Sequence, residues 1–187
     1  MEFEPVPLPE SDEEIRLLEN KRVILRGHFD HSSEILVGPC QNLNAKKVDF
    51  MGEVWPIGYH LFTPFTLSDS GRRILVNRGY VSNLLKDPSR RMLGQVEDEI
   101  TFNAIVELQS NINTVQRLVS HSLKNDWIYD NVFKRIDMEL FSRKLNIDPI
   151  AIFVADKEST LRNGPIGGQI QSSYDSELLS AAFPVVS

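Results

Sequence analysis

Apolar and polar positions alternate in two runs between residues 58 and 81, which predicts two β-strands joined by a tight turn. One face of the first run carries Tyr59, Leu61, Thr63, Phe65 and Leu67, and one face of the second carries Ile74, Val76 and Arg78. Residues 68–71 between them are typical of a hairpin loop, in which Gly71 can adopt a positive φ. Pro64 has no N–H for a sheet ladder, so we expect it at an edge or a bulge. Gly79 interrupts an apolar run and is expected at a bulge or a close backbone approach.

The same analysis predicts further strands and two helices. The strands are expected at residues 22–29, 34–37, 97–108 and 150–155, with a short β-prone piece at 127–129, and the helices at 11–20 and 131–145. Because the strands follow one another rather than alternating with helices, we predict an α+β fold. Its sheet should be mostly antiparallel, curled or closed into a partial β-barrel, and accompanied by the two short helices.

Each predicted helix has its own start signals. Ser11 is the expected N-cap of the first helix, and Glu14 completes a capping box. Asp130 is the expected N-cap of the second helix, and Asn146 can end it in a left-handed conformation. The apolar stripe of the second helix is predicted to consist of Phe133, Ile136, Leu140, Phe141 and Leu145.

Three segments show neither the alternation of a strand nor the three-to-four-residue spacing of a helix. Residues 1–10 contain three prolines, which is typical of an extended linker. Residues 41–56 and 82–94 are predicted to be loops. Because rigid sheets commonly present binding residues on their loops, these two loops are the expected contact surfaces.

Composition limits the classes of function. A chain of 187 residues with 41% apolar residues is long enough for one domain with a sizeable core. Its net charge of −6 argues against nucleic-acid binding, which needs a basic patch to displace phosphate counterions. Cys40 is the only cysteine, so we expect neither an internal disulfide nor a cysteine-based metal site. No run approaches the ~18 apolar residues of a membrane helix and no leader pattern is present, so the chain taken alone is expected to be soluble.

Two histidines and one arginine are candidate binding groups. His28 and His31 lie three positions apart in an extended segment, so their imidazoles are not expected to converge, and solvated turn histidines are the simpler interpretation. His31 alternatively orders the turn or faces a partner. Arg78 either pairs with an acidic neighbour or holds a propionate or a partner's carboxylate by a bidentate contact. Asn77 is predicted to satisfy backbone groups at the Gly79 irregularity.

Signatures of the common enzyme classes are absent from the sequence. Neither the Gly-rich nucleotide-binding patterns nor the GxSxG and HExxH patterns occur. We therefore expect that the protein is not an enzyme, and we assign no catalytic residue and no metal ligand.

Five blocks of the sequence resemble the SURF1/Shy1 family, and they occur in the family's order. They are EPVPLP (residues 4–9), RGHFDHSSEIL (26–36), TPF (63–65), ILVNRGYV (74–81) and GPIGGQ (164–169). The matching motif positions are Gly27, Phe29, Asp30, His31, Thr63, Pro64, Asn77, Arg78, Gly79, Gly167, Gly168 and Gln169.

Members of that family are assembly factors for cytochrome c oxidase, which is complex IV of the respiratory chain. The resemblance therefore implies a role in inserting haem A into the catalytic subunit or in stabilising that subunit. It implies a place at the mitochondrial inner membrane, with the soluble domain facing the intermembrane space. The expected partners are oxidase subunit 1 and other assembly factors.

The resemblance also divides the chain. Residues 11–172 are expected to be the family's soluble domain without the membrane helix that flanks it on each side, and residues 173–187 a divergent tail. The family's candidate haem-ligating histidine corresponds to Leu178 here. The candidates for haem contact that remain are His31 and Arg78. Three hypotheses stay open: a haem-handling assembly chaperone, a protein-interaction scaffold for oxidase intermediates that binds no haem, and a truncated product without activity.

Overall fold

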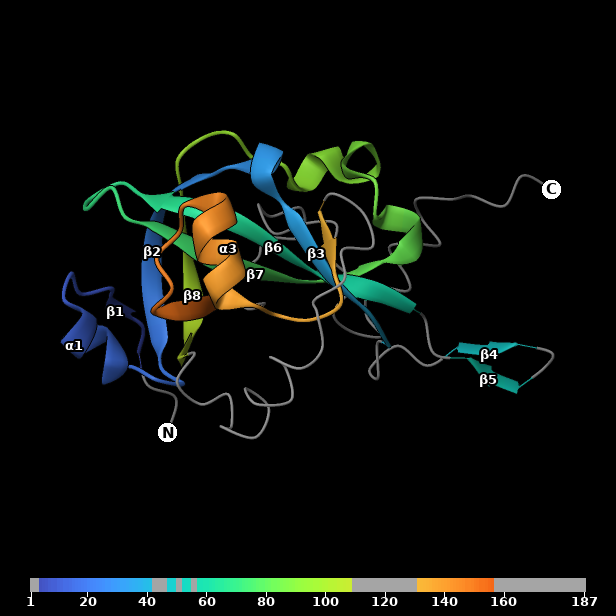
Figure 1. Cartoon of the computed structure of the whole chain (residues 1–187), viewed down its shortest axis with the longest axis horizontal. Coiled ribbons are helices and arrows are strands. Elements are labelled where there is room, and N and C mark those ends of the chain that lie inside the picture. Colours follow the sequence, from blue (N-terminus) through green and yellow to red (C-terminus); the bar gives the residue numbers. More distant parts are fainter. Residues whose placement is uncertain (1–3, 42–46, 50–51, 55–56, 109–130, 157–187) are drawn as a thin grey trace.

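The computed structural model describes residues 4–41, 47–49, 52–54, 57–108 and 131–156 (Figure 1). Eight strands form one sheet: β1 (Val6–Pro7), β2 (Arg22–Phe29), β3 (Ile35–Gln41), β6 (Ile57–Leu67), β7 (Arg73–Ser82), β8 (Ile100–Leu108), β9 (Val132–Phe133) and β10 (Ala151–Ala155). A separate two-stranded hairpin consists of β4 (Lys47–Asp49) and β5 (Gly52–Val54). The helices are α1 (Asp12–Arg16) and α3 (Met138–Leu145), with 3-10 segments η1 (His31–Ser33), η2 (Asn83–Leu85) and η3 (Pro88–Gly94).

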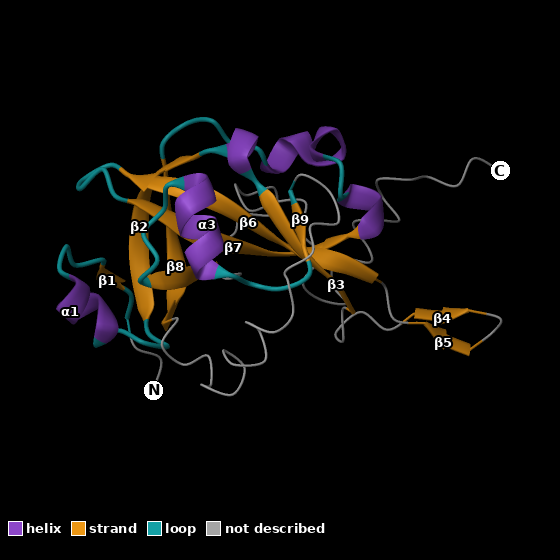
Figure 2. Ribbon diagram, viewed as in Figure 1, coloured by secondary structure: helices purple, strands orange, loops and turns teal. Residues whose placement is uncertain are grey.

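The large sheet curls until two of its non-neighbouring strands meet. Its strand order is β1-β2-β8-β10-β7-β6-β3-β9, and an additional pairing of β2 with β6 joins β2, β8, β10, β7 and β6 into a five-strand ring. Within this sheet the parallel pairs are β1–β2, β7–β10 and β3–β9, and the other pairs are antiparallel. Figure 2 shows strands dominating over the few helices. The predicted α+β fold with a mostly antiparallel curled sheet is confirmed.

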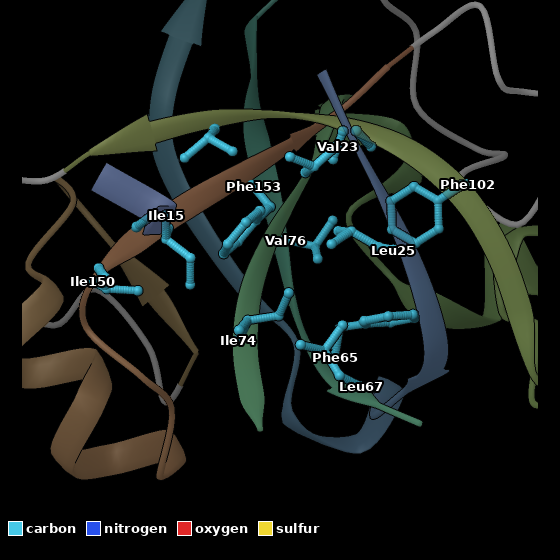
Figure 3. Packing of buried hydrophobic residues seen from close by; sticks show 14 of the residues in the cluster. Ile15, Val23, Leu25, Phe65, Leu67, Ile74, Val76, Phe102, Ile150 and Phe153 are labelled. Atoms are coloured by element: carbon cyan, nitrogen blue, oxygen red, sulfur yellow. The ribbon is translucent and has the colours of Figure 1, made fainter. Parts of the chain in front are cut away.

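The main hydrophobic core fills the inside of the five-strand ring (Figure 3). All five strands contribute to it, and Ile15 of α1 closes one end. Phe29, Phe65 and Phe102 pack with centroid distances of 4.8–5.6 Å. The inward positions of β8 are Phe102, Ala104 and Val106, which alternate with more exposed residues along the strand predicted at 97–108. Burying each large side chain stabilises the folded state by about 1.5–3 kcal/mol.

A second core lies on the outer side of β3, β6, β7 and β10, under α3. Leu75 and Phe62 belong to this core, whereas the neighbouring Ile74 and Val76 belong to the main core. β7 is therefore buried on both faces, and all of its residues except its two ends and Asn77 lie at buried positions, so its burial does not alternate. Phe133 and Phe141 meet edge-to-face at 4.9 Å and close this outer core.

The turn between β6 and β7 has the predicted geometry, whereas Pro64 does not lie where we expected it. Gly71 has φ 69°. Pro64 pairs with Leu75 inside the sheet, so its expected position at an edge or a bulge is wrong. β6 changes partner there, from β3 at Phe62 to β2 at Phe65. On that side the Pro64 carbonyl accepts the Asp30 N–H (2.9 Å). Pro64 thus lies where one strand pairing ends and the next begins, so the N–H that proline lacks costs the sheet no hydrogen bond.

The first helix is shorter than predicted but begins where predicted. Ser11 is its N-cap, and its Oγ accepts the Glu14 N–H at 3.2 Å. The same Oγ also donates to the Glu14 carboxylate at 2.9 Å, in place of the full capping box. Within the segment expected to be an extended linker, Val6 and Pro7 form β1 along β2.

The predicted start of the second helix is wrong by about two turns. α3 begins at Met138, and its N-cap Asp137 accepts the Leu140 N–H at 3.0 Å. Val132 and Phe133 form a strand beside β3 instead, because a tertiary partner for their backbone outweighs the local helical pattern. Ile136 is 38% exposed and lies outside the helix. Asn146 ends α3 at φ 51°, as predicted.

Several expectations concern residues outside the described part of the chain. These are the short strand at 127–129, the Asp130 cap, the motif residues Gly167, Gly168 and Gln169, the position of Leu178, and the tail 173–187. Among the described residues, none of the helices has the length and apolar character needed to cross a bilayer.

Candidate functional site

A bulge in β7 aims Arg78 into the protein interior. Arg78 and Gly79 together lie opposite the single residue Leu61 of β6. Gly79 has φ 102°, and its N–H donates to Asn77 Oδ1 at 2.9 Å. These contacts confirm the bulge predicted at Gly79 and the role predicted for Asn77. The Arg78 side chain is 0% exposed, so its charge needs partners inside the protein.

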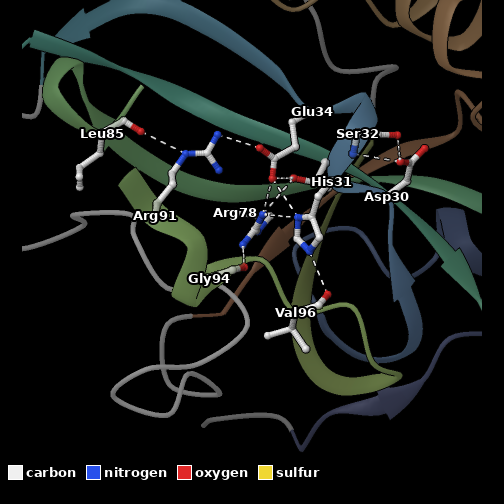
Figure 4. Close-up of polar contacts among 10 residues, drawn as sticks. Asp30, His31, Ser32, Glu34, Arg78, Leu85, Arg91, Gly94 and Val96 are labelled. Carbon is white, nitrogen blue, oxygen red and sulfur yellow. Dashed lines mark hydrogen bonds and ion pairs between the residues drawn. The ribbon is translucent and has the colours of Figure 1, made fainter. Parts of the chain in front are cut away.

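Glu34 supplies the main partner and lies at the centre of a buried charged cluster (Figure 4). Its Oε1 accepts from Arg78 Nη1 at 2.7 Å, and its Oε2 accepts from Arg91 Nη2 at 2.7 Å. His31 Nδ1 lies 3.0 Å from Oε1, and Thr63 Oγ1 lies 3.4 Å from the same oxygen. We refer to these five residues as the Glu34 cluster. One carboxylate thus bridges two guanidinium groups, each at its own oxygen.

The η1 turn places His31 in the cluster. Asp30 caps the turn by accepting the Ser32 N–H at 3.1 Å and the Ser33 hydroxyl at 2.7 Å. Arg73 Nη2 donates to the same carboxylate at 2.5 Å, which ties the turn to β7. The turn that contains His31 is therefore a 3-10 segment with an Asp cap.

The segment that we call the 83–96 loop comprises η2, residues 86–87, η3 and residues 95–96, and the cluster anchors it. Arg91 breaks the 3-10 geometry of η3 with φ −135° and turns inward, where its Nε donates to the Leu85 carbonyl at 3.1 Å. Arg78 donates to the Gly94 carbonyl. His31 Nε2 lies 2.9 Å from the Val96 carbonyl. The loop is thus joined to three groups that belong to the sheet and to the η1 turn.

Burial and pairing shift the ionisation of the cluster in opposite directions. Burial by itself raises the pKa of Glu34, but the hydrogen bonds from His31 and Arg91 and the charges of Arg91 and Arg78 lower this pKa to about 2. Burial lowers the pKa of Arg78 to about 10, although Glu34 opposes this shift. At neutral pH, Glu34 and Arg78 are therefore both charged.

The cluster adjoins the main core through an aromatic contact. The Arg78 guanidinium carbon lies 5.0 Å from the centroid of the Phe29 aromatic ring. Phe29 also packs 5.7 Å from the His31 imidazole. The motif residue Gly27, two positions earlier on β2, allows β6 to approach, since a Cβ there would lie 2.0 Å from the Thr66 carbonyl oxygen. The motif segments of β2, β6 and β7 therefore meet at one place.

The structure brings together both candidate binding residues predicted from the sequence. His31 and Arg78 lie 47 positions apart, yet His31 Nδ1 is 3.3 Å from Arg78 Nη1. Of the two alternatives for Arg78, pairing with an acidic neighbour is confirmed. The interpretation of His31 as a solvated turn residue is wrong, since its side chain is only 12% exposed, whereas His28 is exposed as predicted.

Sequence reasoning missed Glu34 and Arg91 as members of the site. The signal for Glu34 was its place three residues after His31, in the same motif block and directly before the apolar strand β3. Arg91 carried no such signal, because it lies in a polar loop with Arg90 beside it. Within the described ranges, no group of three or more His, Cys, Asp or Glu side chains could hold a metal ion.

Comparisons with known proteins agree with the motif resemblance. The model of the SURF1 family matches residues 1–180. The chain is similar to "Surfeit locus protein 1" of Mus musculus, with 37% identity over 93% of this chain, and of Homo sapiens, with 35% identity over 94%. It spans 55% and 57% of those two proteins. The protein of the same name from Takifugu rubripes is 34% identical and is covered to 71% of its length. On these matches, the chain belongs to the SURF1 family.

Proposed function

We propose that this protein is an assembly factor for cytochrome c oxidase that acts as a docking scaffold for the catalytic subunit at the mitochondrial inner membrane. Membership of the SURF1 family supports the oxidase role. The observation that carries the scaffold role is the convergence of His31 and Arg78 on Glu34. These motif residues form an internal anchor for the exposed 83–96 loop. The proposal includes no catalytic step.

The 83–96 loop has the features of a contact surface. Its Leu84 and Met92 side chains are 64% and 70% exposed, whereas Arg91 next to Met92 is 5% exposed and paired with Glu34. A buried ion pair beneath the loop orders its backbone, so less conformational entropy is lost when a partner binds. Oxidase subunit 1 and other assembly factors are the proposed partners. Of the second predicted contact loop, at residues 41–56, the structure describes Gln41 at the end of β3 and the short hairpin formed by β4 and β5.

Handling of haem A is the second candidate function, and the adjacency of an imidazole and a guanidinium is the observation in its favour. In the described arrangement these groups do not fit a haem. Both nitrogens of His31 lie within hydrogen-bonding distance of protein oxygens, those of Glu34 and Val96. Arg78 is fully buried. We therefore assign no step to haem, and we favour the scaffold.

Capture of oxidase subunit 1 from detergent-solubilised mitochondrial membranes tests the scaffold. The double variant Leu84→Ser/Met92→Ser should capture several-fold less subunit 1 than the wild-type chain, because its apolar contact area is lost. Leu17→Ser is the matched control, since Leu17 is 75% exposed but lies after α1. Equal capture by the double variant and the control would contradict the docking role of the loop, and no capture by the wild-type chain would contradict the scaffold.

A haem titration separates the two candidates. If the scaffold proposal is correct, added haem should give no shift of the Soret band that depends on His31 or Arg78. A shift that His31→Ala and Arg78→Ala abolish, in variants that remain folded by circular dichroism, would favour haem handling instead.

A further inference from the structure

Among the described contacts, those that join the 83–96 loop to the sheet are mostly polar and belong to one cluster. Three side-chain contacts make the connection: Arg91 with Glu34 Oε2 (2.7 Å), Arg78 with the Gly94 carbonyl, and His31 with the Val96 carbonyl (2.9 Å). Lys86 adds a contact with the aromatic ring of Tyr59 at 5.1 Å. Within the described ranges, no residue of the loop pairs with a strand. Its backbone hydrogen bonds, such as Gln95 to Met92, join residues of the loop itself.

The loop also contributes nothing to the hydrophobic cores as far as its side chains are described. The side chain of Leu93 lies outside the described part; of the others, none belongs to any of the three core clusters. Leu84 and Met92 point away from the protein, with 64% and 70% exposure. Separation of the loop from the sheet would therefore expose little apolar surface of the side chains that are described. Apolar burial is the main term that holds elements together. Segments with few buried apolar contacts open at a lower free energy than the whole protein.

We propose that the 83–96 loop is a strap that opens as a unit while the five-strand ring stays folded, and that its opening makes His31 and Arg78 accessible. The closed strap supplies the Gly94 carbonyl to Arg78 and the Val96 carbonyl to His31. When it opens, these two groups exchange the carbonyls for water or for a ligand, while Glu34 remains bonded to Arg78 (2.7 Å). The strap thus controls access to the two candidate binding residues. This inference does not depend on the proposed oxidase role.

Hydrogen exchange of the wild-type 187-residue chain, followed by mass spectrometry at increasing guanidinium concentration, gives the first test. Peptides from the strap should exchange through an opening that is nearly independent of denaturant, because little surface is exposed. Peptides from β2 and β8 should exchange only through global unfolding. If the strap exchanges with the same free energy and the same denaturant dependence as β2 and β8, the proposal is overturned.

A pair of variants locates the anchor. Arg91→Met removes the charged contact from the strap side and leaves the pair of Glu34 with Arg78 in place. It should accelerate exchange of strap peptides at least tenfold without changing those of β8. Asp148→Asn is the matched control, because Asp148 pairs with Arg72, outside the Glu34 cluster, and it should leave the strap unchanged. Equal acceleration of strap and β8 in Arg91→Met, or acceleration of the strap by Asp148→Asn, would overturn the proposal.

Accessibility is measured by carbethoxylation with diethyl pyrocarbonate, mapped by mass spectrometry. The exposed His28 serves as an internal reference. His31 should react more slowly than His28 in the wild-type chain and several-fold faster in Arg91→Met, with the His28 rate unchanged. A His31 rate that is the same in both chains would show that the strap does not control access.

Discussion

At the scale of the residue, two features govern the site: the positive φ of Gly79 and the buried charge of Arg78. The first makes the second possible, because the bulge turns Arg78 toward Glu34. The Arg78 guanidinium then contacts groups from four separate segments, including Thr63 and the Gly94 carbonyl. A substitution at either position should therefore affect stability more than an average surface change.

Gly79→Val tests the bulge. A β-branched residue at φ 102° is strained, so the free energy of unfolding should fall by about 1–3 kcal/mol. Urea unfolding followed by circular dichroism measures this loss. Gly71→Ala is a milder control, since φ is 69° there but a Cβ would meet no atom within 4 Å. An unchanged unfolding midpoint for Gly79→Val would contradict the bulge.

Arg78→Met tests the buried pair. This change leaves the Glu34 carboxylate without its partner on β7, and breaking a buried pair in this way costs about 3–5 kcal/mol. The double variant Arg78→Met/Glu34→Leu removes both charges and should be less destabilised than the sum of the single variants in a double-mutant cycle. Additive losses in urea unfolding would mean that the two side chains do not interact.

At the scale of the element, α3 shows how a cap and a tertiary pairing share the control of a helix start. The stretch from residue 131 has a helical pattern of apolar residues, but the Asn131 carbonyl accepts the Leu36 N–H at 2.8 Å and commits the chain to β9. Asp137 then provides the first N-cap beyond the strand. The resulting helix places Phe141 and Leu145 over the outer core.

Asp137→Ala should destabilise the protein by about 1 kcal/mol, because the Leu140 N–H loses its acceptor. Thermal unfolding followed by circular dichroism detects this change. Glu139→Ala is the control, since Glu139 is exposed and forms a surface ion pair with Arg143 at 3.6 Å, which contributes little. If both substitutions cost the same, Asp137 is not the operative cap.

At the scale of the whole molecule, the five-strand ring and the polar strap divide the protein into a part held by apolar packing and a part held by charge. The ring depends on side chains from all five strands and should respond weakly to pH. The strap depends on the ion pair of Arg91 with Glu34 and on the contacts of its Gly94 and Val96 carbonyls with Arg78 and His31. The acid-dependent part of the stability should therefore come from the Glu34 cluster and from the Asp30 cap. Burial raises the pKa of Asp30, but hydrogen bonds from Ser32, Arg73 and Ser33 lower it well below its usual range.

Acid titration tests this division. The pKa of Glu34 is lowered from 4.5 to about 2 in the folded protein. The stability that this provides is complete above pH 4.5 and is lost as the pH falls from there toward 2. Unfolding free energies measured across this window should decline less steeply for Glu34→Gln than for the wild-type chain. Identical pH slopes for the two proteins would contradict the lowered pKa.

The amino-acid sequence by itself determined the parts of the fold that depend on local order. Alternation set β2, β8 and the β6–β7 hairpin. Gly71 marked a positive φ, Gly79 marked a bulge, and Ser11 and Asn146 marked helix ends. These features arise within a few residues, so the pattern of side chains is sufficient. His31 and Arg78 were identified as candidates for the same reason, since each lies in a short motif.

Only the tertiary structure decided which distant groups meet. The closure of the five-strand ring, the change of partner at Pro64 and the pairing of β9 with β3 depend on strands that are far apart in the chain. Glu34 and Arg91, 57 positions apart, form one ion pair because the bulge, the η1 turn and the strap converge on a single point. No local sequence pattern encodes this contact between distant residues. The free energy that stabilises the cluster comes from burying and neutralising all of its charges together.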